Sequence, residues 1–170
     1  MNLFITSGTP DFLLKLKEKH KGETMILMNN NESSLLVHET DKKTVFSSPR
    51  KYEIIDSAGS LDHEGFAVLN NIPVTDEGRP LFEDRFLNRP RLIENEPGFV
   101  AIRVLRPLGS NNTYIILTIW ENEGAFENWQ KSKAYENAHK KRGTEAGIDA
   151  ARPNIFESAS YVSKYYIEGE

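Results

Sequence analysis

The order of β-rich and helical runs between residues 65 and 166 is the feature that most constrains how this chain can fold. A strand comes first, followed by a helix, two strands, a second helix and a last strand. The runs span residues 65–74, 78–92, 98–105, 113–120, 126–139 and 160–166. The first helix places Leu81, Phe82, Phe86 and Leu87 on one face, as expected of a helix that packs on a sheet. This order predicts an antiparallel sheet with its helices on one face.

The first 63 residues show a shorter form of the same order. A strand at residues 3–6 precedes a helix that starts around Pro10, since proline is tolerated in a first helical turn. Residues 25–28 and 35–38 flank a polar turn and predict a hairpin. A serine-proline start and a closing glycine then predict a short helix across residues 48–59.

Together these patterns predict an α+β protein of the ferredoxin-like, dimeric α+β barrel type. We expect an N-terminal α+β half at residues 1–63 and a ferredoxin-like domain at residues 64–170. The two halves are pseudo-equivalent in pattern, although no obvious sequence identity links them. We expect two antiparallel sheets packed together, each covered on the outside by its own helices.

Composition narrows the class of function. With 38% hydrophobic and 27% charged residues, the chain resembles an ordinary soluble protein. The absence of cysteine excludes disulfides and thiolate ligands and fits a cytoplasmic location. No apolar run approaches the roughly 20 residues that span a bilayer, and the N-terminus lacks the basic start of a signal peptide. The net charge of −4 argues against nucleic acid as a partner, and positive charge is instead local, in residues 79–91 and 131–142.

The best-placed candidate site starts at the β-rich run Ile116–Trp120 and continues into a helix that carries Trp129 and, ten residues on, His139. Ten helical residues rise about 15 Å and leave a rotation of about 80°, so both side chains can line one site only if the ligand is broad. A neutral imidazole can bind iron as a single axial ligand, and the basic run 140–142 can neutralise acidic ligand groups. The alternatives are a solvated histidine at a helix end and a tryptophan packed in the core.

Polar residues on other elements could complete this site. Asn70 and Asn71 interrupt an apolar strand, where asparagine is rare because a buried amide needs partners. They are either residues of a strand end or bulge, or amide donors aimed into the pocket opposite His139. Arg85 and Arg89 are one helical turn apart. These arginines either hold ligand carboxylates in bidentate fashion or form an ion-paired surface with nearby acidic residues.

The sequence from residue 65 to about residue 166 resembles the antibiotic biosynthesis monooxygenase (ABM) superfamily, and within it the IsdG-type heme-degrading monooxygenases. That family has an asparagine in its first strand, a strand ending in I-L-T-apolar-W, then A-F-x-x-W, and A-H ten residues beyond the tryptophan. This chain has the same elements in the same order: Asn70, Ile116–Trp120, Ala125–Trp129 and Ala138-His139. Asn70 is preferred over Asn71 because residues 70–75 match the family's N-x-h-x-h-T pattern, in which h is apolar.

The resemblance implies a role for each of these residues. His139 would be the axial ligand of heme iron, Asn70 the hydrogen-bonding residue on the distal side, and Trp129 the large side chain that helps to ruffle the porphyrin. Four further residues fall in the stretch that borders heme in the family: Arg85, Phe86, Arg89 and Arg91. The implied activity is oxidative opening of the porphyrin with O2, releasing iron and a bilin-type product. Electrons would come from an external donor such as a reductase or ascorbate, since the chain has no flavin or nicotinamide motif.

Two other functions stay open on the sequence alone. One is a non-catalytic signalling or stress protein, with or without bound heme. The other is a cofactor-free monooxygenase that acts on a polycyclic aromatic substrate. Single-domain members of the superfamily dimerise to close their sheets into a barrel. Since the N-terminal half can supply the second sheet here, we expect a monomer.

Overall fold

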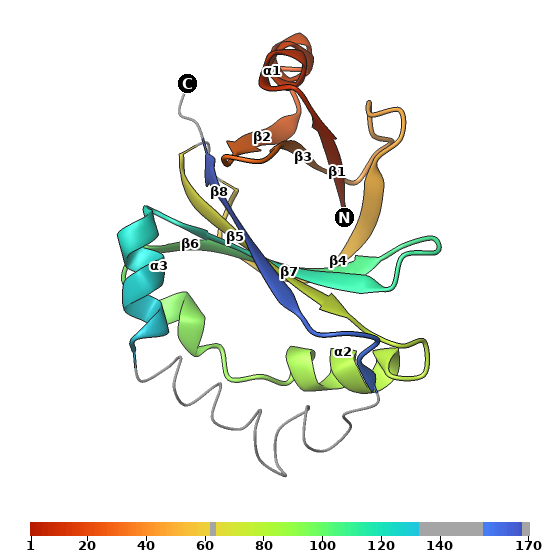
Figure 1. Ribbon diagram of the computed structural model, residues 1–170, viewed down its shortest axis with the longest axis vertical. Helices are drawn as coiled ribbons and strands as arrows, with labels where there is room; N and C mark the ends of the chain where they lie inside the picture. Colours follow the sequence, from red (N-terminus) through yellow and green to blue (C-terminus); the bar gives the residue numbers. More distant parts are fainter. Residues whose placement is uncertain (62–63, 133–154, 168–170) are drawn as a thin grey trace.

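The computed structural model of the protein describes residues 1–61, 64–132 and 155–167. Within them, eight strands form one closed antiparallel barrel in the order β1-β3-β2-β8-β5-β7-β6-β4, with the helices outside it (Figure 1). The elements are β1 (Asn2–Gly8), α1 (Pro10–Lys19), β2 (Thr24–Asn29), β3 (Ser34–Thr40), β4 (Arg50–Ala58), β5 (Gly65–Pro73), α2 (Arg79–Leu87), the 3₁₀ turn η1 (Leu92–Asn95), β6 (Phe99–Pro107), β7 (Thr113–Trp120), α3 (Glu123–Gln130) and β8 (Tyr161–Ile167). No helix in these described ranges is long and apolar enough to cross a membrane.

The barrel is assembled from two four-stranded halves. The first half contributes the strands β4-β1-β3-β2, and the second half contributes β8-β5-β7-β6. Counted along the chain within each half, the spatial order is the same in both: fourth strand, first, third, second. At one seam β4 pairs with β6 over six residue pairs, and at the other β2 meets β8 at two. The expected pair of packed sheets is therefore a single continuous barrel. The edge strands of each half pair with those of the other, which leaves fewer unpaired edges than two separate sheets would.

The helix expected across residues 48–59 is wrong, because this segment forms β4. Its side chains alternate: Tyr52 is fully buried and Ile54 packs inside the barrel, whereas Lys51 is exposed. The strand pairs with both β1 and β6, so its backbone is hydrogen-bonded on both sides. The period of two and the tertiary pairing outweighed the helix-start signal of the serine-proline pair.

The two helices of the second half differ from the expected bounds. The helix expected at residues 78–92 ends at Leu87, and the η1 turn follows after Pro90, a residue that disfavours helix in the residue before it. The helix expected at residues 126–139 begins earlier, because the Asn122 side chain caps it by accepting from the Ala125 backbone N–H at 2.9 Å. The structure describes α3 to Gln130, and residues 133–154 lie outside the described residues.

Apolar side chains form layers on both sides of the barrel wall. One cluster fills the interior with residues from both halves, among them Leu3, Tyr52 and Leu117. Outside the first half, α1 and the segment 41–49 cover a second cluster: Phe4, Leu13, Met25, Leu27, Leu36 and Phe46. Outside the second half, two clusters lie under the helices, one including Phe82 of α2 and the other Phe126 of α3. Asn70 and Trp129, which the structure describes, lie on the outer face of the second half.

Candidate functional site

The two asparagines of β5 point to opposite sides of the barrel wall. Asn71 is 4% exposed and shares the inward side of β5 with Leu69. Its Nδ2 donates to the backbone oxygens of Leu69 at 3.1 Å and Tyr161 at 3.2 Å, and to Ser163 Oγ at 3.3 Å. Asn71 is therefore a satisfied structural residue that ties β5 to β8.

Asn70 faces the helix-covered side, between Ile116 of β7 and Val162 of β8. Its Oδ1 is buried and has no hydrogen-bond partner among residues 1–61, 64–132 and 155–167. Buried polar side-chain atoms are nearly always hydrogen-bonded, so an unpartnered amide calls for a ligand or a functional reason. Of the two asparagines, the structure gives only Asn70 an unused polar group on the candidate face.

Trp129 lies at the end of α3 and forms the aromatic edge of the same face. Its ring packs against Trp120, with ring centroids 5.5 Å apart and planes tilted by 31°, and against Phe126 at 6.0 Å. Trp120 is fully buried and donates from Nε1 to Thr118 Oγ1 at 3.1 Å, so it is a core residue. Trp129 is half-buried, which combines both sequence interpretations: one side packs on the core and the other stays accessible.

The residues expected at the far end of this helix lie outside the described residues. They include His139, the predicted iron ligand, and the basic run Lys140-Lys141-Arg142. The approach of His139 to Asn70 or Trp129 is therefore not described, and its role as an axial ligand stays a prediction.

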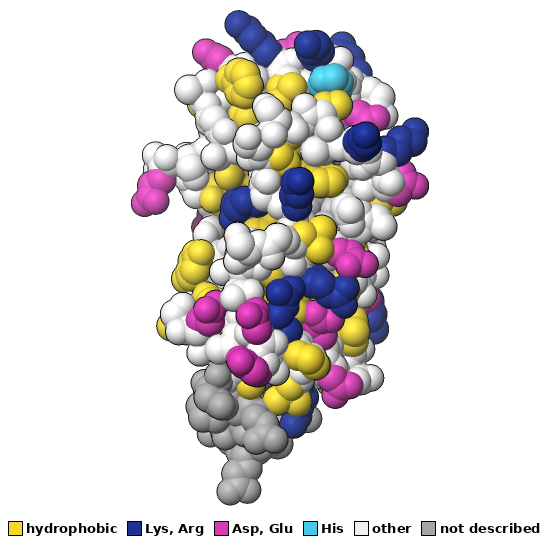
Figure 2. All heavy atoms as spheres, turned by 90° about the vertical axis from the view of Figure 1, so that its right-hand side faces the viewer, with side chains coloured by type: hydrophobic (Ala, Val, Ile, Leu, Met, Phe, Trp, Pro, Cys, Tyr) yellow, Lys and Arg dark blue, Asp and Glu magenta, His cyan; other side chains and the backbone are white. Residues whose placement is uncertain are grey.

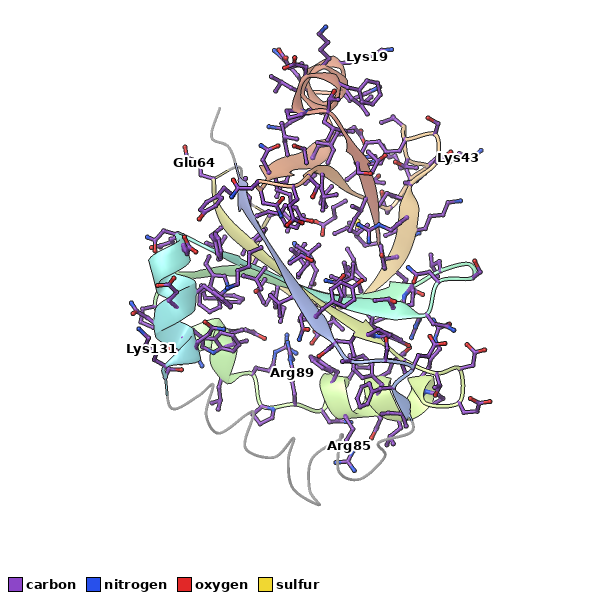
Figure 3. All side chains as sticks on the ribbon, viewed as in Figure 1. Lys19, Lys43, Glu64, Arg85, Arg89 and Lys131 are labelled. Atoms are coloured by element: carbon purple, nitrogen blue, oxygen red, sulfur yellow. The ribbon has the colours of Figure 1, made fainter. Side chains whose placement is uncertain are left out.

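The arginines expected to border the ligand are placed differently from one another. Arg85 is exposed and points away from the sheet, whereas Arg89, from the connection between α2 and η1, points towards it (Figure 3). Arg89 donates to Asp56 at 3.2 Å, and Arg91 donates to both oxygens of the same carboxylate at 3.0 and 3.1 Å. Phe86 packs on Phe82 with ring centroids 5.1 Å apart. The ion-paired alternative therefore applies to Arg89 and Arg91, and their partner Asp56 comes from the first half.

A second polar network fixes α2 to the sheet and was not anticipated from the sequence. Glu83 accepts hydrogen bonds from Arg106 Nε at 2.9 Å and from the Tyr114 hydroxyl, while Arg79 donates to that hydroxyl at 3.3 Å. The hydrogen bond from Arg106 lowers the pKa of Glu83. Burial, followed by the Glu83 carboxylate, raises the pKa of Tyr114 to about 12. Arg79 is thus a structural residue, and the network holds α2 over the outer face.

The surface around these networks is mixed in charge. Figure 2 shows lysine and arginine side chains interspersed with aspartate and glutamate over the lower part of one side of the molecule. Arg91 is ion-paired with Asp56 and Glu94, and Arg106 is ion-paired with Glu53 and Glu83. The local positive charge expected at residues 79–91 is therefore largely balanced by acidic neighbours.

Residues 65–141 match the family described as antibiotic biosynthesis monooxygenase, so the chain is an ABM-domain protein. A heme-degrading monooxygenase of Listeria monocytogenes is 28% identical over 149 residues, covering 86% of this chain and 89% of the relative. The signal transduction protein TRAP of Staphylococcus epidermidis is 26% identical over 165 residues, covering 97% and 96%. The resemblance found in the sequence is confirmed: this ABM-domain protein is related to heme-degrading monooxygenases and to staphylococcal TRAP.

A solved structure described as a major regulator of staphylococcal pathogenesis superimposes on this one with a TM-score of 0.84. The match covers 99% of this chain and 100% of the other, at 23% sequence identity. Such a likeness concerns the fold alone and supports the two-half barrel as one shared architecture. The comparisons therefore define the family, and the two kinds of relative are about equally close.

Proposed function

We propose that this protein is a heme-degrading monooxygenase that opens the porphyrin ring oxidatively and releases iron and a bilin-type product. The observation that carries the proposal is the outer face of the second half, where the Asn70 side chain has a buried amide oxygen without a hydrogen-bond partner among the described residues. Trp129 adds a half-buried indole at the edge of the same face. A largely apolar face with few unused polar groups suits a broad, flat ligand that needs orientation more than many hydrogen bonds. The heme-degrading relative, which covers most of the chain, supports the same ligand.

Each residue has a separate task in this proposal. His139 would hold the iron from one side, and Asn70 would lie on the other side as a hydrogen-bonding group. Trp129, supported from behind by the buried Trp120, would press on the porphyrin and favour its ruffled form. When bound, heme supplies both the iron that activates O2 and the carbon that is oxidised, and an external reductase or ascorbate supplies electrons. Arg85, Phe86, Arg89 and Arg91 would border the ligand, and Arg89, the arginine that points towards the sheet, would face one of its acidic groups.

The closed barrel supports a monomer as the working unit. The first half supplies four of the eight strands, so a second chain is not needed to complete the sheet. We place the protein in the cytoplasm, in line with its cysteine-free sequence.

Titration with hemin tests the proposal. The wild type should bind one hemin with a shifted Soret band, and His139→Ala should shift the band differently and bind more weakly. Lys133→Ala, a change close in the sequence but outside the predicted set, is the matched control and should bind as the wild type does. If His139→Ala binds and degrades heme as well as the wild type, the assignment of the iron ligand is wrong.

A second candidate is a non-catalytic signalling role, favoured by the match to TRAP over 97% of this chain. It predicts that bound hemin, if any, survives ascorbate and O2 and that no iron reaches a chelator. The two candidates can therefore be separated with one preparation of protein, by following the Soret band after the reductant is added.

A further inference from the structure

We infer that Asp56, in the first half, positions Arg89 of the second half to receive an acidic group of the ligand. The inference rests on the proposed function, because it concerns how a porphyrin that carries carboxylates is held. Asp56 lies outside residues 65–141, the part of the chain that matches the ABM family. The N-terminal half would thus contribute to binding as well as closing the barrel.

A β-bulge turns Asp56 towards the site. Ile54 packs inside the barrel opposite Leu105, and the register with β6 then shifts so that Asp56 lies opposite Val104. Val104 belongs to the apolar cluster on the helix-covered outer face. If side chains alternated regularly from Ile54 to Asp56, Asp56 would face the interior as Ile54 does, and the bulge between them turns Asp56 to the outer side instead. The bulge therefore brings a carboxylate out beneath the connection between α2 and η1.

Asp56 holds two guanidinium groups at once. Its side chain is 14% exposed. Arg91 donates one hydrogen bond to each of its oxygens, at 3.0 and 3.1 Å, and Arg89 Nη1 donates to Oδ2 at 3.2 Å. The two hydrogen bonds from Arg91 fix the plane of its rigid guanidinium against Asp56, and the single bond from Arg89 holds its Nη1 at the same carboxylate.

Arg89 keeps one donor unused in this arrangement. Its Nη2 is buried and makes no hydrogen bond within the described part of the chain, where the Glu94 carboxylate oxygen Oε2 lies 3.7 Å away. Burial lowers the pKa of Arg89, and Asp56 acts in the opposite direction, so the guanidinium stays charged. Figure 3 shows Arg89 pointing towards the sheet, unlike Arg85. A carboxylate of the ligand would give Nη2 the hydrogen-bond acceptor that it lacks.

The orientation of Arg89 and the net charge of the cluster predict opposite changes in the affinity for an acidic ligand when Asp56 is substituted. Two carboxylates, Asp56 and Glu94, balance the two guanidiniums of Arg89 and Arg91, so this cluster has no net charge with which to attract an anion. Removing the charge of Asp56 makes the cluster positive and would favour an acidic ligand by attraction alone. It also releases Arg89 from the bond that aims it. A charge-assisted hydrogen bond corresponds to roughly ten-fold or more in affinity, so the loss of orientation should prevail.

The test compares hemin with hemin dimethyl ester, in which both carboxylates are blocked. Soret titrations give the ratio of the two affinities for the wild type and each variant. Asp56→Asn removes the charge, and Asp56→Glu keeps the charge but displaces the carboxylate by one methylene. Asp41→Asn, on an exposed turn of the same half, is the matched control for net charge. Thermal unfolding of each variant establishes that it is folded.

We expect the wild type and Asp41→Asn to prefer hemin over the ester by roughly ten-fold. Both Asp56 variants should lose most of this preference while binding the ester as the wild type does. A wild type without any preference, an unchanged or increased preference in Asp56→Asn, or a loss in Asp56→Asn that Asp56→Glu does not share would overturn the inference. A wild type that binds neither porphyrin would instead refute the proposed function itself.

Discussion

The connection from β3 to β4 in the first half and the connection from β7 to β8 in the second occupy equivalent places but cover their sheets differently. Residues 41–49 contain no helix, and Phe46 seals the first sheet with only 7% of its surface exposed. His38, fully buried, has a partner for each ring nitrogen: Thr44 Oγ1 at 2.9 Å and Glu23 Oε1 at 2.7 Å. The second connection contains α3, and the sheet beside it carries Asn70, whose Oδ1 has no partner.

This difference shows how a buried polar residue with a structural role can be distinguished from a polar residue that belongs to a binding site. His38 and Asn70 lie on the outer faces of equivalent sheets, and either could be named as a functional residue from its type alone. His38 is closed in and fully paired, so its environment is complete without a ligand. Asn70 is incomplete, as expected of a group whose partner arrives from outside. The outer face of the first sheet is therefore complete by itself, whereas the outer face of the second sheet carries the candidate site.

The largest expected effect is a loss of stability on substituting a residue of the closed outer face of the first half. Phe46→Ala would remove a buried ring that packs on His38 with ring centroids 5.5 Å apart, and should lower the free energy of unfolding by about 3–5 kcal/mol. Urea unfolding measures the change. Hemin affinity of the folded variant should stay that of the wild type. If hemin binding is weakened in proportion to the loss of stability, the face of the first half is not separate from the ligand site, and the distinction between the two faces is wrong.

The second largest expected effect concerns the contacts that attach α1 and α2 to their sheets. The first-half helix buries Leu13 in an apolar cluster, whereas α2 also depends on the Glu83 network. Glu83→Gln should lower the free energy of unfolding by about 1–3 kcal/mol at neutral pH. Because the pKa of Glu83 is lowered by folding, its contribution is present above the unfolded value and is lost as the pH falls through the folded pKa.

Denaturant unfolding of Glu83→Gln and the wild type at neutral and acidic pH checks this sign, since the difference between them should shrink in acid. Glu53→Gln is the matched control. Glu53 binds the same Arg106 at 2.8 Å but is 47% exposed, so its removal should change the free energy of unfolding by less than about 1 kcal/mol. Equal effects of the two variants would mean that α2 is not held mainly by Glu83.

The smallest effect separates the two neighbouring asparagines. Asn71→Leu should cost about 1–3 kcal/mol, because it breaks hydrogen bonds to β8 and leaves buried acceptors without a donor. Asn70→Leu removes an unpartnered amide and should leave the free energy of unfolding within about 1 kcal/mol of the wild type, or raise it. Thermal and urea unfolding of the pair measure the difference. A larger loss in Asn70→Leu than in Asn71→Leu would mean that the two roles are exchanged.

Much of the fold could be predicted from the sequence, because most strands carry a clear apolar pattern. The exception was β4, where a serine-proline start resembled a helix and the pairing that makes it a strand comes from β1 and β6. The joining of the halves into one barrel likewise depends on strand pairing between residues far apart in the sequence. No pattern within either half shows whether its sheet edges are free or paired.

The site could be predicted only in part. The family pattern selected Asn70, but both faces of β5 are apolar, so alternation could not tell which asparagine faces inward. Asp56 was missed because nothing local marks it: it lies far in the sequence from Arg89 and Arg91, and a bulge decides its direction. The role of His139 as an iron ligand stays a prediction, since that residue lies outside the described part of the chain.

The most direct test of the central claim is the rate at which hemin-loaded protein loses its Soret band in ascorbate and O2, with released iron captured by a chelator. The wild type should lose the band and release its iron, whereas Asn70→Leu should still bind hemin but turn it over roughly a hundred-fold more slowly. A Soret band that persists in the wild type with no iron released would contradict the account. So would an Asn70→Leu variant that degrades heme as fast as the wild type.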